Sequence, residues 1–235
     1  RHEVPIIAHR VKKAAMAGSQ ISIINFQSYE YFFKTFEHIY DSEILNHLAG
    51  IAVAVAGKDV PESISKICKD VKPTDAQIRI ANSLMNAENS MIIQGLIALR
   101  SNSASAIRTL SSVIGELTNS SFGGLSEGPN SAGGYLTGIL PHRRNVGIKR
   151  ELVGLTAAEI LNKPMDFTLL FGVEPSDLSC VNNPIALLDS HNFVCSITPY
   201  CTDTMEQVCD LMLPIGTFAE TSGTYVNCEG RWQSF

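Results

Sequence analysis

Apolar residues recur along this chain at two spacings, and these predict alternating helices and strands. The clearest helical spacing, with apolar residues every three or four positions, lies in 103–117. It is carried by Ile107, Leu110, Ile114 and Leu117. A weaker repeat in 74–86 puts Ile78, Ala81 and Met85 on one helix face. We therefore expect both segments to bury one side against a core.

Short continuous apolar runs predict strands that are buried on both faces. These strands are expected at 21–26, 90–96, 166–171, 192–198 and 211–213. Helices are expected at 2–17, 41–48, 61–72, 74–86, 103–117, 156–162, 183–190 and 202–208. The alternation predicts an α/β fold: a mostly parallel, doubly wound sheet with helices on both faces.

A glycine-rich stretch divides the chain. Six glycines fall within 122–144, and such loops are either flexible or packed closely against a ligand or partner. We therefore expect a first α/β unit at 1–120, a glycine-rich connection at 121–150 and a second α/β unit at 151–235.

The stretch 210–233 is expected to organise the second unit. Its strand ends at Pro214, which cannot donate to a sheet, and a glycine-punctuated loop leads to another strand. At Gly223 we expect a backbone conformation that valine cannot adopt. Five charged or amide residues fall within 220–233, although only 17% of the chain is charged: Glu220, Asn227, Glu229, Arg231 and Gln233. This density marks the loop as a candidate site.

Composition excludes several classes of function. The 235 residues carry a net charge of −5, which gives no basic footprint for nucleic acid. No apolar run approaches the ~18 residues of a membrane span. The six cysteines include no Cys-x-x-Cys pair, and the six histidines no metal-binding spacing. The sequence therefore predicts no metal site and no direct membrane insertion.

The order of residues in 210–233 resembles a known signature. Asp-x-x-Leu-Pro from Asp210, followed by Glu-Thr-x-Gly-Thr-x-x-Asn-x-Glu-Gly-Arg-x-Gln from Glu220, is similar to the molybdopterin oxidoreductase superfamily. It most resembles the branch without molybdenum, the large iron–sulfur subunit of respiratory complex I. Arg1-His2-Glu3-x-Pro5 resembles the segment of that subunit just after a strand, which implies a further strand ahead of residue 1.

A second segment resembles the same branch. Glu127-Gly128-Pro129-Asn130-Ser131-Ala132-Gly133-Gly134 takes the place where formate dehydrogenases tend to carry Gly-Gln-Asn-Asn-x-Gln-Gly, whose polar side chains face a pterin. Of those amides only Asn130 is kept. Several polar contacts would be lost together, which argues against a bound molybdopterin.

The resemblance implies an internal piece of complex I, the NADH–quinone oxidoreductase. The parent would carry 2Fe-2S and 4Fe-4S clusters that relay electrons from NADH and flavin toward quinone. This segment would hold no cluster and act as a scaffold that docks other peripheral-arm subunits. The expected location is the cytoplasmic face of the bacterial inner membrane, or the matrix side of the mitochondrial inner membrane.

Two alternatives stay open. In a molybdenum or tungsten oxidoreductase such as a formate dehydrogenase, this segment would bind the nucleotide arms of the pterin cofactor. The candidate contacts are Glu174, Glu220, Thr221, Gly223, Thr224 and Asn227. The third interpretation is a binding module for a small nucleotide. These three interpretations make different predictions for two places: the glycine-rich loop around Asn130, and the crevice beside Glu174, which follows the strand expected at 166–171. Each place could be filled by a ligand, packed shut or open.

Overall fold

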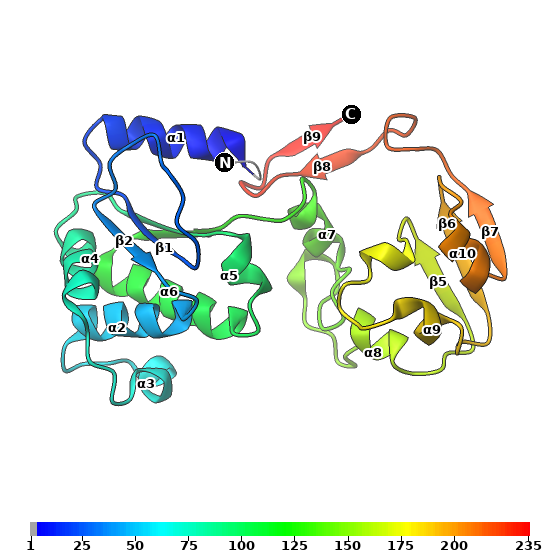
Figure 1. Cartoon of the computed structure of the whole chain (residues 1–235), viewed down its shortest axis with the longest axis horizontal. Coiled ribbons are helices and arrows are strands. Elements are labelled where there is room, and N and C mark those ends of the chain that lie inside the picture. Colours follow the sequence, from blue (N-terminus) through cyan, green and yellow to red (C-terminus); the bar gives the residue numbers. More distant parts are fainter. Residues whose placement is uncertain (1–3) are drawn as a thin grey trace. The chain divides into compact units, whose positions relative to one another are not determined.

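The computed structural model describes residues 4–235, so the first turn of the expected helix at 2–17 lies partly outside the described residues. The chain divides into two compact units, 1–127 and 128–235, called here the first and second units (Figure 1). The glycine-rich segment belongs to both. Its start forms strand β4 (Ser121–Gly124) of the first unit, and helix α7 (Ser131–Thr137) belongs to the second.

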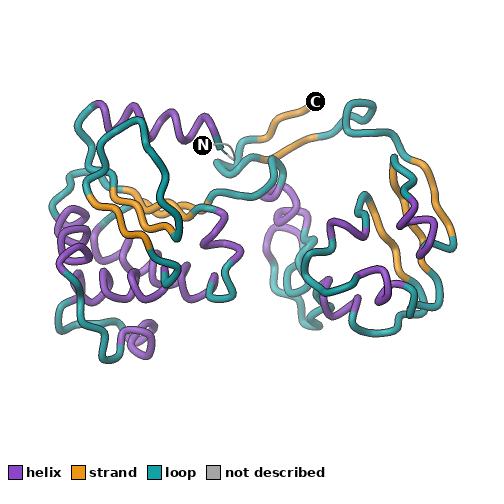
Figure 2. The backbone as a smooth tube through the Cα atoms, viewed as in Figure 1, coloured by secondary structure: helices purple, strands orange, loops and turns teal. Residues whose placement is uncertain are grey.

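The first unit combines helices with two pairs of parallel strands. Its other elements are α1 (Pro5–Met16), β1 (Ser22–Asn25), β2 (Glu37–Tyr40), α2 (Ile44–Ala56), α3 (Glu62–Cys68), α4 (Asp75–Met85), β3 (Met91–Gln94), α5 (Leu96–Arg100) and α6 (Ala104–Thr118). β1 pairs with β2 and β3 with β4, each in parallel. Figure 2 shows these strands in orange against the helices.

Helix α2 is the centre of the first core. It packs against α4 and α6, and its small buried residues Ala49 and Ala52 allow a close approach to Ile80 of α4 and Leu110 of α6. The sequence predicts a helix at 41–48 and a separate apolar run at 51–56. The structure joins them, because a helix that is apolar all round is stable when it is buried between two others.

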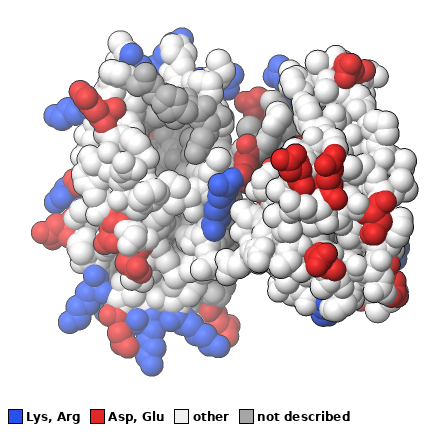
Figure 3. All heavy atoms as spheres, turned by 45° about the vertical axis from the view of Figure 1, so that its right-hand side comes forward, with Lys and Arg blue, Asp and Glu red and all other residues white. Residues whose placement is uncertain are grey.

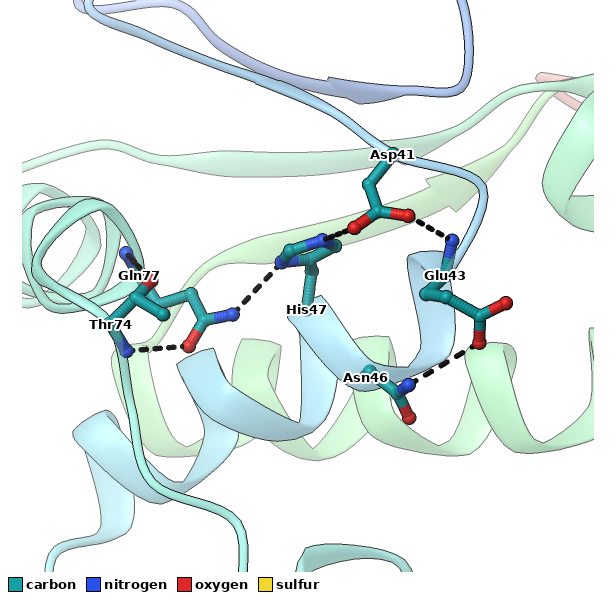
Figure 4. A network of polar contacts seen from close by, with 6 residues as sticks. All are labelled: Asp41, Glu43, Asn46, His47, Thr74 and Gln77. Carbon is teal, nitrogen blue, oxygen red and sulfur yellow. Dashed lines mark hydrogen bonds and ion pairs between the residues drawn. The ribbon is translucent and has the colours of Figure 1, made fainter.

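The expected buried face of α4 is wrong in part. Ala81 is buried, but Ile78 is 40% exposed and Met85 43%, whereas the polar Gln77 is buried. Gln77 is buried because its amide is hydrogen-bonded at both ends. Its oxygen accepts the backbone N–H of Thr74 (2.8 Å), and its nitrogen donates to Nδ1 of His47 (2.9 Å). This is the capping box of α4 extended to another helix (Figure 4).

Asp41 completes this network. Its carboxylate accepts the backbone N–H of Glu43 (2.9 Å) and lies 3.0 Å from Nε2 of His47. Because Gln77 donates to the other ring nitrogen, Nε2 carries the proton that Asp41 accepts. One imidazole therefore joins the β2–α2 turn to the start of α4, and both of its nitrogens are used.

The Asp41 contacts make a pH-dependent contribution to stability. The Glu43 N–H, and then His47, hold the pKa of the Asp41 carboxyl below its usual value. A carboxyl whose pKa is lower in the folded state stabilises the fold above its unfolded pKa of about 3.9, and this contribution is lost as pH falls through the folded pKa. We expect Asp41→Asn to remove part of the acid-side loss of stability in urea unfolding between about pH 5 and pH 2. Glu88→Gln, at an exposed turn, is the control; equal pH slopes for the two variants would contradict the assignment.

The second unit contains a three-stranded parallel sheet and an antiparallel hairpin. Its other elements are η1 (Asn145–Gly147), α8 (Ala157–Leu161), β5 (Thr168–Phe171), η2 (Pro175–Asp177), α9 (Pro184–Leu188), β6 (Val194–Thr198), α10 (Asp203–Val208), β7 (Leu211–Pro214), β8 (Thr224–Val226) and β9 (Trp232–Ser234). The sheet order is β5-β6-β7, and β8 pairs with β9. The predicted α/β fold with mostly parallel strands is confirmed, and the strands within residues 4–235 are divided among four short sheets.

Burial differs among the strands of the parallel sheet: β6 is buried on both faces, as expected, whereas β5 is buried on one face only and β7 is largely exposed. Leu170 and Val194 pack with Leu161, Leu188 and Val208 from α8, α9 and α10. On the opposite face Leu169 and Phe171 of β5 are 50% and 66% exposed, and Leu211 and Leu213 of β7 are exposed too. Cys195 of β6, which lies between Leu169 and Leu211, is buried. An apolar run thus identified the strands, but the elements packed against them decide which side is buried.

No helix within residues 4–235 has the length and apolar character needed to cross a bilayer.

Candidate functional site

The two stretches that the sequence singled out meet in the second unit. Oδ1 of Asn130, the residue just before α7, accepts the backbone N–H of Val226 in β8 at 2.9 Å. Gly133 makes room for this side chain, since a Cβ there would lie 2.0 Å from Asn130 Oδ1. We call this contact between Asn130, Gly133 and Val226 the Asn130 junction.

Glu220 and Thr221 are engaged with their own loop. Oε2 of Glu220 accepts the backbone N–H (2.8 Å) and the hydroxyl (3.0 Å) of Thr217. The backbone N–H, and then the hydroxyl, lower the pKa of Glu220, so the carboxylate is ionised. Thr221 donates to the carbonyl of Thr217 at 3.3 Å. These bonds shape the turn after β7.

Asn227 closes the hairpin. Its Oδ1 accepts the backbone N–H groups of Glu229 (3.0 Å) and Arg231 (2.9 Å), while Gly230 turns the chain at φ +77°. Thr224 lies opposite Ser234 in the β8–β9 pair. The order of polar residues in this segment therefore builds a turn with its own hydrogen bonds.

The reason expected for Gly223 is wrong. Its φ lies outside the left-handed region, so its backbone does not require glycine. What restricts the position is the Phe235 ring, whose Cζ would lie 2.9 Å from an added Cβ. Because that ring belongs to a side chain that is 51% exposed, it can rotate away. We expect Gly223→Val to cost only about 1 kcal/mol in urea unfolding, and a loss as large as that of a buried cavity mutant would contradict this.

Glu174 lies on a different loop. It follows β5 and Gly172, and its backbone N–H donates to Asp177 of η2 at 3.0 Å. Because β5, β6 and β7 are parallel, the Glu174 loop and the Glu220 loop leave the sheet at the same edge, where ligands of α/β proteins commonly bind. Each of these two residues forms its hydrogen bonds within its own loop, however.

Gly138 and Arg150 hold the end of α7 and the 142–150 loop together, which the sequence did not indicate. Gly138 ends α7 at φ +84°, and an added Cβ would lie 2.4 Å from the backbone of Arg144 and Asn145. Arg150 donates to the carbonyls of Arg143 (2.8 Å) and Gly138 (3.2 Å), which holds the 142–150 loop against the end of α7. Glycine is common just after the end of a helix, so the sequence could have indicated the role of Gly138. The contacts of Arg150 are seen only in the fold.

The Asn130 junction makes a testable contribution to stability. Asn130→Ala leaves the N–H of the buried Val226 without its partner, so we expect a loss of about 1–3 kcal/mol in the unfolding free energy of the second unit. Asn145→Ala, at an exposed position of the same unit, is the control and should change it by no more than about 0.5 kcal/mol. Equal unfolding curves for the two variants would show that the Asn130 junction does not stabilise the second unit.

The contacts of these residues bear on whether they could hold the nucleotide arms of a pterin cofactor. The oxygens of Asn130, Glu220 and Asn227 already accept backbone N–H groups. Residues 128–235 hold six Lys and Arg against eleven Asp and Glu, a net charge of −5, and Figure 3 shows acidic side chains spread over the visible face of this unit. These internal bonds use acceptors that the ribose hydroxyls and guanine of a nucleotide would need, and the excess of carboxylates in the unit opposes a pyrophosphate.

Metal-binding groups are likewise dispersed. Across residues 4–235, no three side chains among His, Cys, Asp and Glu gather where they could hold a metal ion. The six cysteines are free thiols, of which Cys68 and Cys195 are buried.

Comparison with known proteins identifies the family. The family model described as molybdopterin oxidoreductase matches residues 1–235. A protein of the formyltransferase/hydrolase complex FhcABCD from Methylorubrum extorquens, solved with methylofuran, is similar in fold with a TM-score of 0.59 and 14% identity. The match covers 98% of this chain and 65% of that one, so this chain spans less than two thirds of its length. A search of curated proteins gave no match. The chain belongs to the molybdopterin oxidoreductase family.

Proposed function

We propose that this chain is part of the large iron–sulfur subunit of complex I, in which it acts as a scaffold without a cluster of its own. The observation that carries this proposal is the Asn130 junction. The one amide kept from the pterin-facing loop of formate dehydrogenases is bonded to Val226 in the signature hairpin. A side chain that could have faced a cofactor here holds two protein segments together.

The other signature residues support the same role. Glu220 and Asn227 fix the turns on either side of β8 through bonds to nearby backbone. In a protein that relays electrons between iron–sulfur clusters, the distances between clusters must be held, and rigid turns of this kind would serve that end. The 2Fe-2S and 4Fe-4S clusters would be carried by other parts of the parent.

The uncovered face of the β5-β6-β7 sheet supports docking. Leu169 and Phe171 of β5 and Leu211 and Leu213 of β7 are exposed apolar residues on one face of the sheet, on either side of β6, and exposed apolar surfaces of this kind mark interaction sites. We propose that other peripheral-arm subunits of complex I cover it. The protein would then lie on the cytoplasmic face of the bacterial inner membrane, or on the matrix side in mitochondria.

A molybdenum or tungsten oxidoreductase, with Glu174, Glu220, Thr221, Gly223, Thr224 and Asn227 at the nucleotide arms, is the second candidate. One observation favours it. Four of the six cationic residues of the second unit fall within 143–150, next to the end of α7, where an anion would be attracted. The internal bonds of Asn130, Glu220 and Asn227 weigh against it.

Purification of the full-length protein from detergent-solubilised membranes tests the proposal. We expect it to elute with flavin and with NADH–quinone reductase activity. Elution with formate-dependent reductase activity, or with neither, would contradict the complex I assignment.

The same purification tests the docking surface. Phe171→Asp places a charge on the uncovered sheet face and should abolish co-elution with the other subunits. Leu152→Asp is the matched control, because Leu152 is 89% exposed in a loop of the same unit, and co-elution should survive. Loss of co-elution in both variants, or in neither, would contradict the role of this face.

A further inference from the structure

A small hairpin at 142–150 of the second unit ends in an exposed tip. Arg143 and Lys149 pair as an antiparallel bridge, and the N–H of Arg144 donates to the carbonyl of Ile148 at 2.7 Å. The three residues between these arms form η1, and all three are exposed. This segment, called here the basic hairpin, therefore presents its tip to solvent.

The base of the basic hairpin is held against the end of α7. The guanidinium of Arg150 donates to the carbonyls of Arg143 (2.8 Å) and Gly138 (3.2 Å). Nη1 of Arg143 donates to the carbonyl of Gly147 at 3.3 Å. Because these bonds fix the hairpin before any partner arrives, binding through its tip would cost little ordering entropy.

Val146, at the tip, has a backbone conformation that its side chain disfavours. Its φ of +58° and ψ of +21° lie in the left-handed region, which a β-branched residue rarely adopts. The other non-glycine residues with positive φ in the described part of the chain are Asp70, Asn119 and Asn183, which tolerate this region better. The Val146 side chain is 74% exposed, so packing within the unit does not offset the strain. Strain of this kind is typical of sites that contact a ligand or partner.

Positive charge is concentrated around this tip. The basic hairpin carries three Arg, one Lys and no carboxylate, whereas the rest of residues 128–235 holds two cations and eleven Asp and Glu. Ile148, two positions from Val146, is 60% exposed. The tip therefore offers two apolar side chains among cations, on a unit that is otherwise acidic.

We propose that the basic hairpin binds a partner protein, with Val146 and Ile148 inserted into an apolar pocket whose rim carries carboxylates. Three of its four cations are Arg, which is enriched in protein interfaces and whose guanidinium pairs with a carboxylate through two parallel bonds. The hairpin has no Trp or Tyr, the residues that proteins commonly place at the level of lipid headgroups. Its chemistry therefore favours an acidic protein surface over an anionic membrane. This binding mode follows from the hairpin alone and does not require the complex I assignment.

Photochemical cross-linking in intact host cells identifies what the tip contacts. The full-length protein carries benzoylphenylalanine in place of Ile148, or in place of Phe218 as the matched control, which is 79% exposed in another loop of the same unit. After irradiation, the cross-linked peptides are identified by mass spectrometry. We expect the probe at 148, but not the probe at 218, to link to a peptide of another protein in which apolar residues are flanked by Asp or Glu.

Several results of this cross-linking would overturn the proposal. Links from position 148 to lipid would replace the protein partner with a membrane. Links within the same chain only, links to a peptide without carboxylates, or the same links from both positions would show that the tip has no acidic partner of its own.

Charge exchange tests the predicted pairing. Arg144 and Lys149 are both exposed, so reversing their charge should leave the fold intact. Arg144→Glu combined with Lys149→Glu should lower the cross-link yield from position 148 at least about tenfold, and replacing the linked carboxylates of the partner with Lys should restore it. A yield that the reversal leaves unchanged, or a loss that the partner's substitutions do not restore, would overturn the proposal.

Val146→Asn separates binding from folding. Asn adopts positive φ more readily than a β-branched residue, so we expect this variant to unfold at a higher urea concentration. Its cross-link yield from position 148 should nevertheless fall, because the polar side chain no longer fits an apolar pocket. An unchanged yield, or a lower urea midpoint, would overturn the role assigned to Val146.

Discussion

Replacing Gly50 with alanine is expected to destabilise the first unit by about 2 kcal/mol, although alanine is the better helix former. A Cβ at Gly50 would lie 2.0 Å from Oε1 of Gln77 and 2.5 Å from its Cδ. Gln77 is buried and holds the Thr74 N–H and His47 Nδ1, so moving it breaks both bonds. Loss of a cap costs about 0.5–2 kcal/mol and an unpaired buried amide about 1–3, against about 1 gained in helix propensity.

The measurement is urea unfolding of Gly50→Ala beside two other variants. Gly95→Ala is the control, since an added Cβ there meets nothing within 4 Å. In a Gln77→Ala background the clash is gone, so Gly50→Ala should cost little or even stabilise. A Gly50→Ala variant as stable as Gly95→Ala, or equally harmful with and without Gln77, would contradict the predicted close contact.

Replacing Gly138 with alanine is expected to be the most damaging small change in the second unit, at about 3 kcal/mol. Two costs combine there. Its φ of +84° is strained for any residue with a Cβ, by about 1 kcal/mol. The added Cβ would also lie 2.4 Å from the backbone of Arg144 and Asn145, and relief of such overpacking costs about 1–3 kcal/mol.

Gly147→Ala separates the two costs. Gly147 lies in the neighbouring turn with φ +76°, but an added Cβ meets nothing within 4 Å. It should therefore show only the backbone term, about 1 kcal/mol. Urea unfolding of both variants gives the comparison. Equal losses at the two glycines would mean that the 142–150 loop does not pack against the end of α7 as described.

The sequence predicted elements better than it predicted burial. The helical repeat identified α6 because Ile107, Leu110 and Ile114 are all buried, although Leu117, its fourth member, is 42% exposed. The pattern predicted that Ile78 is buried, but the buried side of α4 carries Gln77 instead, whose amide is hydrogen-bonded there. It failed at Leu213 as well, because burial of a strand depends on the elements packed against each face, which no local pattern contains.

The candidate site was predictable in its residues but not in its contacts. Asn130 and the loop from Glu220 to Asn227 stood out by composition and by resemblance to a family. That Asn130 reaches Val226, 96 positions away, follows only from the fold. The sequence also could not show that Glu220 and Asn227 accept hydrogen bonds from the backbone of nearby residues. The residue type is the same whether a side chain is free to bind a ligand or closes its own turn.

The measurement that tests the scaffold role most directly is the metal and nucleotide content of the full-length protein, purified without oxygen. Iron, molybdenum and tungsten are determined by elemental analysis, and guanine nucleotide is determined after acid release. We predict iron with no molybdenum, tungsten or guanine nucleotide. Molybdenum or tungsten together with guanine nucleotide would contradict this, and the loops of Glu174 and Glu220 would then be cofactor contacts.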